Sequence, residues 1–230
     1  MGNLGDRMKE NYENRYRTKL LRRTPVILRL DGKAFHTLTR GCNKPFDEEF
    51  NKAMLVTATR LFEQVQGAKL AYIQSDEISI LLTDFDTLQT DAWFDYNLQK
   101  LCSVSAGYAS VFFTDAYGKT GIFDCRAFNI PKEEVCNYFI WRQKDWERNS
   151  LQMLARTHFS NNELHGKKSQ DIHDMLHGIG VNWADLEDKY KNGSCIHKYF
   201  TLTAMDYNKI FSKNRDIVEQ YMTGEEKGGS

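Results

Sequence analysis

The order of apolar segments between residues 25 and 131 constrains the fold of this chain more than any other feature. Short runs rich in aliphatic and β-branched residues indicate buried strands, and longer stretches with apolar side chains at helical spacing indicate helices. In chain order these are a strand at 25–31, a helix from Asp47 to before Gly67, strands at 70–74 and 78–84, a helix at about 92–112 and a strand at 121–131. Strand, helix, strand, strand, helix, strand is the ferredoxin-like order. We therefore expect an α+β fold in which helices cover one face of an antiparallel βαββαβ sheet.

The chain after Pro131 has a different character. It predicts a long amphipathic helix at about 133–156, a shorter helix at 169–176, a helix within 183–193 that ends at Gly193, and a late strand within 196–206. We interpret residues 1–131 as one domain that begins with a basic helix, and residues 132–230 as a mainly helical C-terminal region.

Composition restricts the class of protein. With 230 residues, 41% of them hydrophobic, the chain can bury a core. Its five cysteines are scattered without a Cys-x-x-Cys pair, which argues against a disulfide framework or a zinc ribbon. No stretch reaches the roughly 18 apolar residues of a membrane span, and the N-terminus lacks an apolar signal core. We expect a soluble, cytoplasmic protein that makes no membrane contact.

Charge is distributed unevenly, although the net charge is zero. Residues 1–23 hold seven basic side chains against three acidic ones, whereas Asp84, Asp86, Asp91 and Asp95 crowd a later segment. The basic segment is either a nucleic-acid contact or a solvated charged helix, and the sequence leaves both open.

Three carboxylates stand at the ends of predicted strands. Asp31 closes the first strand, and Asp76 and Glu77 lie in the turn of the hairpin. A right-handed crossover places the end of the first strand and the hairpin tip at one edge of the sheet, so these side chains should converge. Grouped carboxylates repel one another and suit Mg²⁺, and two such ions can orient an attacking hydroxyl and stabilise a departing pyrophosphate. The alternative is that both sites are ordinary polar turns.

Three motifs at these positions are similar to those of a known family. Residues 29–36 read Arg-Leu-Asp-Gly-Lys-Ala-Phe-His, residues 44–47 read Lys-Pro-Phe-Asp, and residues 72–77 read Tyr-Ile-Gln-Ser-Asp-Glu. Together they resemble the tRNA-His guanylyltransferase family and its Thg-like relatives, the 3′-to-5′ polymerases. The resemblance covers a palm domain up to Pro131 and continues more loosely into the C-terminal helices. It implies a reaction in which the 3′-hydroxyl of a nucleotide attacks an activated 5′ end of tRNA.

The resemblance also implies roles for individual residues. Asp31, Asp76 and Glu77 would be catalytic; Asp31, the Gly32 carbonyl and Asp76 would bind two Mg²⁺ ions, and Glu77 would be a further ligand or an organiser of the site. The nucleotide, GTP or another nucleoside triphosphate, would be bound by Asp31, Gly32, Lys33, Ala34, Phe35, His36, Ser75, Asp76 and Arg126. Contacts to tRNA are expected from Arg148, Arg156, His158 and Lys167. ATP is a candidate activator of the 5′ end, and the family pattern implies a homotetramer.

One segment departs from the family pattern. Eukaryotic members carry His-Ile-Asn-Asn-Leu-Tyr-Asn, whereas residues 158–164 read His-Phe-Ser-Asn-Asn-Glu-Leu. In those members the motif accompanies activation of a monophosphorylated 5′ end and addition of a guanosine at position −1. Its absence favours template-dependent repair of truncated tRNA, with the −1 addition as the alternative.

Two other classes share the predicted strand order. A nucleotide cyclase also has a carboxylate hairpin, but a Gly-Gly pair is expected before its acidic residues, and Gln74-Ser75 stands there. A non-catalytic RNA-binding module of the RRM type needs exposed aromatic residues on its central strands, and residues 25–31 and 78–84 carry aliphatic ones. We expect a nucleotidyltransferase.

Overall fold

A computed structural model describes residues 3–199, 202–206 and 210–223. Its centre is a six-stranded sheet in which every neighbouring pair is antiparallel, in the order β4-β1-β3-β2-β5-β6. The strands are β1 Val26–Gly32, β2 Ala68–Gln74, β3 Glu77–Leu82, β4 Phe123–Asn129, β5 Ser194–Tyr199 and β6 Leu202–Asp206. The first four have the expected ferredoxin-like arrangement, and the late strand predicted from the sequence is a hairpin that widens the sheet.

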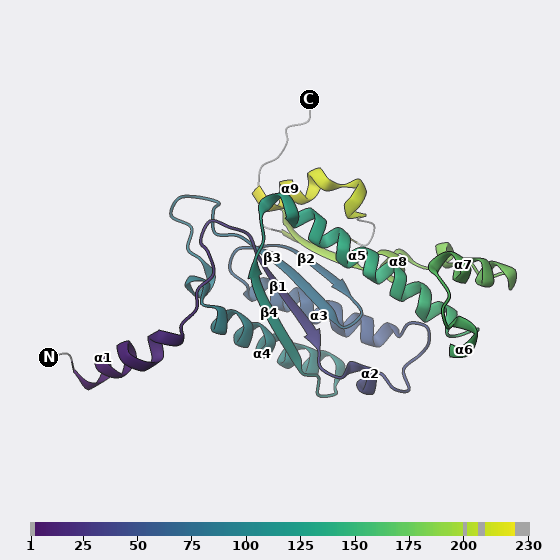
Figure 1. Cartoon of the computed structure of the whole chain (residues 1–230), viewed down its shortest axis with the longest axis horizontal. Helices are drawn as coiled ribbons and strands as arrows, with labels where there is room; N and C mark the ends of the chain where they lie inside the picture. Colours follow the sequence, from purple (N-terminus) through teal and green to yellow (C-terminus); the bar gives the residue numbers. More distant parts are fainter. Residues whose placement is uncertain (1–2, 200–201, 207–209, 224–230) are drawn as a thin grey trace, which may run out of the picture.

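One face of the sheet is covered by α3 (Glu48–Gln64) and α4 (Leu98–Tyr117) (Figure 1). Alternate residues of β1, namely Val26, Leu28 and Leu30, point into this layer, as the two-residue period of a strand requires. The expected N-cap of α3 is confirmed, because the Asp47 side chain accepts a hydrogen bond from the amide of Phe50. The expected helix at 92–112 instead begins at Leu98, where the Asn97 side chain caps α4, and a separate 3₁₀ turn spans Trp93–Tyr96.

The opposite face is covered by α5 (Lys132–Ala155) and α9 (Arg215–Thr223) (Figure 1). Ile27, Leu70 and Leu81 project from the strands into this second layer and pack with Phe139 and Val218. No helix within the described residues is long and apolar enough to cross a membrane. The prediction that the helices of the βαββαβ unit cover one face of the sheet is thus confirmed. The C-terminal region adds a second layer of helices on the other face.

Short helices continue from the end of α5: α6 (Asn161–Leu164), α7 (Ser169–Gly178) and α8 (Asp188–Asn192). The end of α5 forms a separate small core with α6 and α7, which includes Leu154, Leu164, Ile172 and Leu176. The single helix predicted within 183–193 is wrong in detail, because the extended backbone at Leu186 separates a 3₁₀ turn, Trp183–Asp185, from α8.

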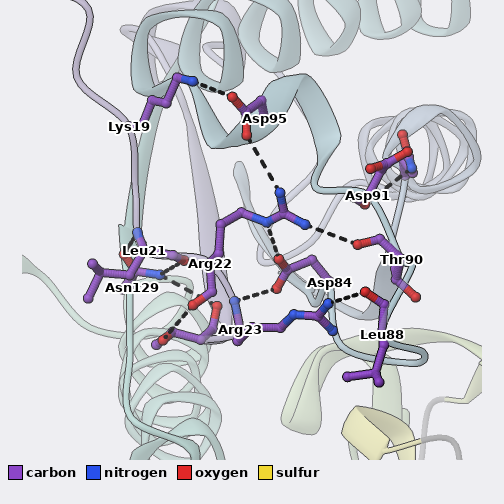
Figure 2. A network of polar contacts seen from close by, with 12 residues as sticks. Lys19, Leu21, Arg22, Arg23, Asp84, Leu88, Thr90, Asp91, Asp95 and Asn129 are labelled. Carbon is purple, nitrogen blue, oxygen red and sulfur yellow. Dashed lines mark hydrogen bonds and ion pairs between the residues drawn. The ribbon is translucent and has the colours of Figure 1, made fainter.

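The N-terminal segment consists of α1 (Leu4–Met8), a π-helical turn (Lys9–Glu13) and a 3₁₀ turn (Asn14–Tyr16), none with a buried residue. It extends away from the rest of the molecule (Figure 1). The basic residues that follow it turn back onto the acidic segment (Figure 2). Arg22 Nε lies 2.5 Å from Asp84 Oδ2, and Lys19 forms an ion pair with Asp95. Part of the basic charge of residues 1–23 is therefore neutralised by the acidic residues of the later segment.

Candidate functional site

Asp31 and Asp76 come together at one edge of the sheet. In the antiparallel register Asp31 stands opposite Glu77, the first residue of β3. The backbone amide of Gly32 donates a hydrogen bond of 3.0 Å to the carbonyl oxygen of Asp76, which ties the end of β1 to the hairpin turn. The turn holds only Ser75 and Asp76, and Ser75 has a φ of 47°. The convergence expected from the order of the strands is confirmed.

The loop that follows Asp31 folds tightly because Gly32 lacks a side chain. A Cβ atom at this position would lie 2.5 Å from the ring of Phe35, which belongs to the short helix α2 (Phe35–Leu38). Phe35 is 3% exposed and packs against Phe50, Phe113 and Phe123. The ring therefore anchors the loop to the core, and its expected contact with a nucleotide stays a prediction.

A cleft of about 420 Å³ opens between this edge of the sheet and α5. Its floor comes from the strands and the hairpin turn, with Arg29, Asp31, Gln74, Ser75, Asp76 and Glu77. Its other wall is one side of α5, with Arg142, Asp145, Trp146, Asn149, Gln152, Met153 and, just after the helix, Arg156. Carboxylates and guanidinium groups thus line the same cleft.

The pKa of each of the two aspartates in the cleft is raised, although the charges of Arg29 and Arg126 partly offset the shift at Asp31. Burial raises the pKa of Asp31, and the nearby charges of Glu77 and Asp124 raise it further. Burial also raises the pKa of Asp76, with a further contribution from Asp31. Among the described residues, neither forms an ion pair with a basic side chain. Ionisation of this pair is favoured by a cation.

Glu77 has the opposite environment. Its Oε1 accepts a hydrogen bond of 2.7 Å from Arg142 Nε, and its Oε2 accepts one of 2.8 Å from Arg142 Nη2. Oε2 also accepts a hydrogen bond of 2.9 Å from Arg29 Nε. Within the described residues no group of three His, Cys, Asp or Glu side chains is arranged to hold a metal ion. Glu77 is thus paired with two arginines, whereas Asp31 and Asp76 have no ion pair among the described residues.

A second cavity, of about 220 Å³, adjoins the first. Its lining comes mainly from α2, the loop before α3 and the hairpin turn, with one residue each from α3 and α5: Phe35, His36, Thr39, Cys42, Asn43, Lys44, Pro45, Asp47, Phe50, Ser75, Asp76 and Met153. Ser75, Asp76 and Met153 line both cavities. Asp76 therefore stands where the two meet.

Comparison with known proteins identifies this arrangement. The family model described as tRNAHis guanylyltransferase matches residues 5–131, which include β1, the hairpin and β4. The chain belongs to this family. It is 28% identical to the tRNA(His) guanylyltransferase of Debaryomyces hansenii, over 80% of this chain and 77% of the relative.

Two solved structures of a bacterial tRNA(His) guanylyltransferase (Thg1)-like protein are also similar. The complex with ATP is 44% identical, with a TM-score of 0.90 over 96% of this chain and 99% of the other. The complex with GTP is 44% identical, with a TM-score of 0.85 over 95% and 98%. Membership of the tRNA-His guanylyltransferase family makes the protein a nucleotidyltransferase, as expected, and disfavours the cyclase and the RNA-binding module.

The other residues expected to bind nucleotide in this family member are spread around the two cavities. His36 lines the second cavity. Lys33 is exposed and donates its backbone amide to Ile122, and Ala34 has a φ of 57°. Arg126 lies on β4 opposite Arg29, where its charge lowers the pKa of Asp31. Neither Lys33 nor Arg126 lines either of these two cavities, and their phosphate contacts stay predictions.

The residues expected to bind tRNA separate into two groups. Arg156 lines the cleft, and Arg148, on an exposed part of α5, forms an ion pair with Asp145. His158 and Lys167 are exposed on the turns before and after α6 and do not line either cavity. Only Arg156 is thus placed beside the carboxylates.

Sequence reasoning missed the contribution of α5 to the cleft. Arg142, Trp146, Asn149 and Met153 recur at intervals of three or four residues, which places them on one side of a helix. This spacing is visible in the sequence, but polar residues such as Arg142 and Asn149 are equally typical of the solvent-exposed side of a helix. The two tryptophans of α5 differ in exposure. Trp146 is buried, at 4% exposed, whereas Trp141 is 53% exposed and its ring lies beside the guanidinium of Arg142.

Proposed function

We propose that this enzyme adds nucleotides in the 3′-to-5′ direction to the 5′ end of truncated tRNA, with the opposite strand of the acceptor stem as template. The observation that carries the proposal is the cleft itself, in which Asp31 and Asp76 lie beside Arg29 on the floor and face Arg142 on the wall formed by α5. Acidic groups that favour a cation beside guanidinium groups that favour phosphate are suited to phosphoryl transfer.

The donor atoms of the acidic corner fit Mg²⁺. Carboxylate and carbonyl oxygens are the ligands that Mg²⁺ takes, and Asp31, Asp76 and the Gly32 carbonyl would hold two such ions. When bound, the ions would neutralise phosphate charge and favour ionisation of the attacking hydroxyl. Glu77, whose oxygen atoms are taken up by Arg29 and Arg142, would hold those guanidinium groups in place for the triphosphate.

Two adjoining cavities allow both reactants to bind at once. The bacterial relative with 44% identity is described in complexes with ATP and GTP, which supports nucleoside triphosphates as substrates here. The incoming nucleotide would occupy the cavity lined by His36, Lys44 and Asp47, and the 5′ end of tRNA would occupy the cleft beside α5. Asp76, at their junction, would lie next to the reacting groups.

The proposed step is balanced without a further reactant. The 3′-oxygen of the nucleotide forms a bond to the α-phosphorus of the tRNA 5′-triphosphate, and the bond from that phosphorus to the pyrophosphate oxygen breaks. The hydroxyl proton passes to the solvent. Arg29 and Arg142, which line the cleft, would stabilise the negative charge that gathers on the departing pyrophosphate.

Templated repair is preferred to guanosine addition at position −1 because of residues 158–164. Here Ser160 and Glu163 form a capping box at the start of α6, so the glutamate that departs from the eukaryotic motif is held by the local backbone. The 44% identity to a bacterial Thg1-like protein, against 28% to the Debaryomyces hansenii enzyme, supports the same choice. Base pairing can select the nucleotide while the protein binds helix shape and phosphate.

Further properties rest on the family resemblance alone. They are assembly as a homotetramer, activation of a 5′-monophosphate by ATP, and subunit or tRNA contacts by the C-terminal region. A location in the cytoplasm is proposed from the five scattered cysteines, which suit a reducing compartment.

The test is to incubate the enzyme with Mg²⁺, each of the four nucleoside triphosphates and a set of 5′-truncated or intact tRNAs, and to sequence the 5′ ends. We expect truncated tRNAs of several identities to receive the complementary base, any of the four, more efficiently than intact histidine tRNA receives guanosine. Incorporation of guanosine alone, whatever the opposing base, would favour the −1 activity. An Asp76→Asn variant is the inactive control.

A further inference from the structure

The loop at residues 43–48, between α2 and α3, has two sides. On one side Asn43, Lys44, Pro45 and Asp47 line the second cavity. On the other side the loop contacts α8, which lies far away in the sequence. The ring of Phe46 is stacked on Tyr190, with ring centroids 4.4 Å apart and an interplanar angle of 7°.

Glu48, where α3 begins, strengthens this contact. Its Oε2 accepts a hydrogen bond of 2.5 Å from the Tyr190 hydroxyl and forms an ion pair of 2.8 Å with Lys189 Nζ. Neither Lys189 nor Tyr190 lines the second cavity. The two residues thus contact the loop from behind, away from the space that a ligand would occupy.

α8 is itself fixed to the body of the enzyme. The Tyr190 carbonyl accepts a hydrogen bond of 2.6 Å from Ser150 of α5, and the Asn192 carbonyl accepts one of 2.9 Å from the hydroxyl of Tyr72 in β2. Ser150 and Tyr72 are fully buried. Gly193 then lets the chain pass close to Tyr72, because its φ is 76° and a Cβ would lie 2.6 Å from the Tyr72 hydroxyl. α8 is therefore a firm support for a loop that has little regular structure of its own.

Such a support matters for binding. A loop that is already held in its ligand-binding conformation does not lose that conformational freedom when the ligand arrives, so affinity rises without a new contact to the ligand. The Asp47 side chain accepts a hydrogen bond across the loop from the amide of Asn43, and another from the amide of Phe50 in α3. These bonds close the loop onto the start of α3, and the ring of Phe46 is held in addition by its stack on Tyr190.

We propose that Lys189 and Tyr190 are positioning residues that hold loop 43–48 in the shape of the nucleotide cavity. The C-terminal region would then contribute to nucleotide affinity without touching the nucleotide. This inference rests on the proposed function, because it takes the second cavity as the site of the incoming nucleoside triphosphate.

The test compares the steady-state constants of variants at the support. Tyr190→Ala removes both the stack and the hydroxyl, and should raise KM for the nucleoside triphosphate by about tenfold while kcat stays within about twofold. Tyr190→Phe keeps the stack and should restore KM to within about threefold of the wild-type value. Lys191→Ala is the matched control, since Lys191 lies on the same helix but bonds to Asp188 and the Ala184 carbonyl.

A second arm approaches the contact from the loop and does not depend on the fold of α8. Phe46→Leu keeps an apolar side chain but cannot stack, and should raise KM in the same way. Hydrogen exchange at the amides of residues 41–44 and 46–48 should be faster in Tyr190→Ala and Phe46→Leu than in the wild type, and unchanged in Lys191→Ala.

The possible outcomes are distinct. If the wild type neither binds nor adds nucleotides, the proposed function fails. If the wild type is active and both Tyr190→Ala and Phe46→Leu leave KM and loop exchange unchanged, the positioning role is wrong. A fall in kcat with unchanged KM would also overturn it, because it would place Tyr190 in the chemical step. If Tyr190→Ala does not fold, Phe46→Leu decides.

Discussion

Glu77 and Arg142 form a two-point ion pair inside the cleft, with Nε 2.7 Å from Oε1 and Nη2 2.8 Å from Oε2. Both residues are almost fully buried, at 5% exposed each. This pair joins β3 to α5 and therefore fixes the distance between the two walls of the cleft. It also separates the roles of three carboxylates that look alike in the sequence, because Asp31 and Asp76 have no such partner among the described residues.

The first prediction concerns Glu77. Glu77→Ala leaves the buried guanidinium of Arg142 without its main partner, and should lower the free energy of unfolding by about 3 kcal/mol. Glu77→Gln keeps some of the hydrogen bonds and should cost less. Chemical denaturation measures both, with Arg148→Ala as the control, because its exposed pair with Asp145 contributes about 1 kcal/mol or less. A Glu77→Ala variant as stable as the wild type would show that the pair does not hold the walls together.

The second prediction concerns Asp31 and Asp76. Asp31→Asn and Asp76→Asn each remove one charge from a mutually repelling pair, so the thermal midpoint should stay the same or rise while nucleotide addition is lost. Differential scanning calorimetry and 5′-end sequencing measure the two effects. Loss of folding in either variant would show that these carboxylates hold the structure, and normal turnover would show that they do not carry the chemistry.

The third prediction follows from the raised pKa of Asp31 and of Asp76. A raised pKa in the folded state means that the native protein binds more protons than the unfolded chain. The stability contributed by these groups is therefore present below the unfolded pKa, about 3.9 for Asp, and is lost as pH rises through the folded pKa. The stability gain of Asp76→Asn over the wild type should be small at pH 4 and larger at pH 7. A gain that shrinks as pH rises would contradict the direction of the shift.

The meeting of Asp31 with the hairpin turn was predictable because it follows from connectivity. Once β1 is followed by a helix and a hairpin, the sheet order brings the end of β1 beside the turn, whatever the side chains are. The family resemblance then predicted catalytic roles for Asp31 and Asp76, whose positions already follow from the order of the strands.

The partners of Glu77 were not predictable in the same way. Arg142 is 65 residues away on a helix, and which side of that helix faces the sheet depends on how α5 packs against residues such as Ile27 and Leu81. The same limit applies to Phe46 and Tyr190, whose contact depends on the bent path between α7 and β5. Long-range side-chain partners of this kind depend on packing rather than on local pattern.

The fourth prediction concerns Asp84, which is fully buried and binds the chain at Arg22 and Arg23, just before β1. Its Oδ1 accepts a hydrogen bond of 2.9 Å from the amide of Arg23, and its Oδ2 pairs with Arg22 (Figure 2). Asp84→Ala should lower the free energy of unfolding by about 2 kcal/mol, mainly because the amide loses its acceptor. Asp86→Ala, which breaks a more exposed pair with Lys69, should have little effect. If both variants lost the same free energy of unfolding, the buried contacts of Asp84 with Arg22 and Arg23 would not be the reason for the loss.

The last prediction concerns the binding of tRNA. If phosphates lie along α5, affinity should fall steeply with salt, because each neutralised phosphate releases counterions. Arg156 lines the cleft and has no ion pair among the described residues, whereas Arg148 is already paired with Asp145. Arg156→Glu should therefore weaken tRNA binding more than Arg148→Glu does, and should reduce the slope of log K against log salt by about one.

Filter binding of a truncated tRNA over a range of salt concentrations measures both the affinity and the slope. Arg60→Glu is the matched control, because Arg60 lies on α3, on the opposite face of the sheet, in a similar exposed pair with Asp115. Nucleotide affinity should be unchanged in Arg156→Glu, since Arg156 does not line the second cavity. A flat salt dependence would exclude this surface as the tRNA site. Equal losses in the Arg60 and Arg156 variants would mean that the effect comes from net charge, not from the position of Arg156 in the cleft.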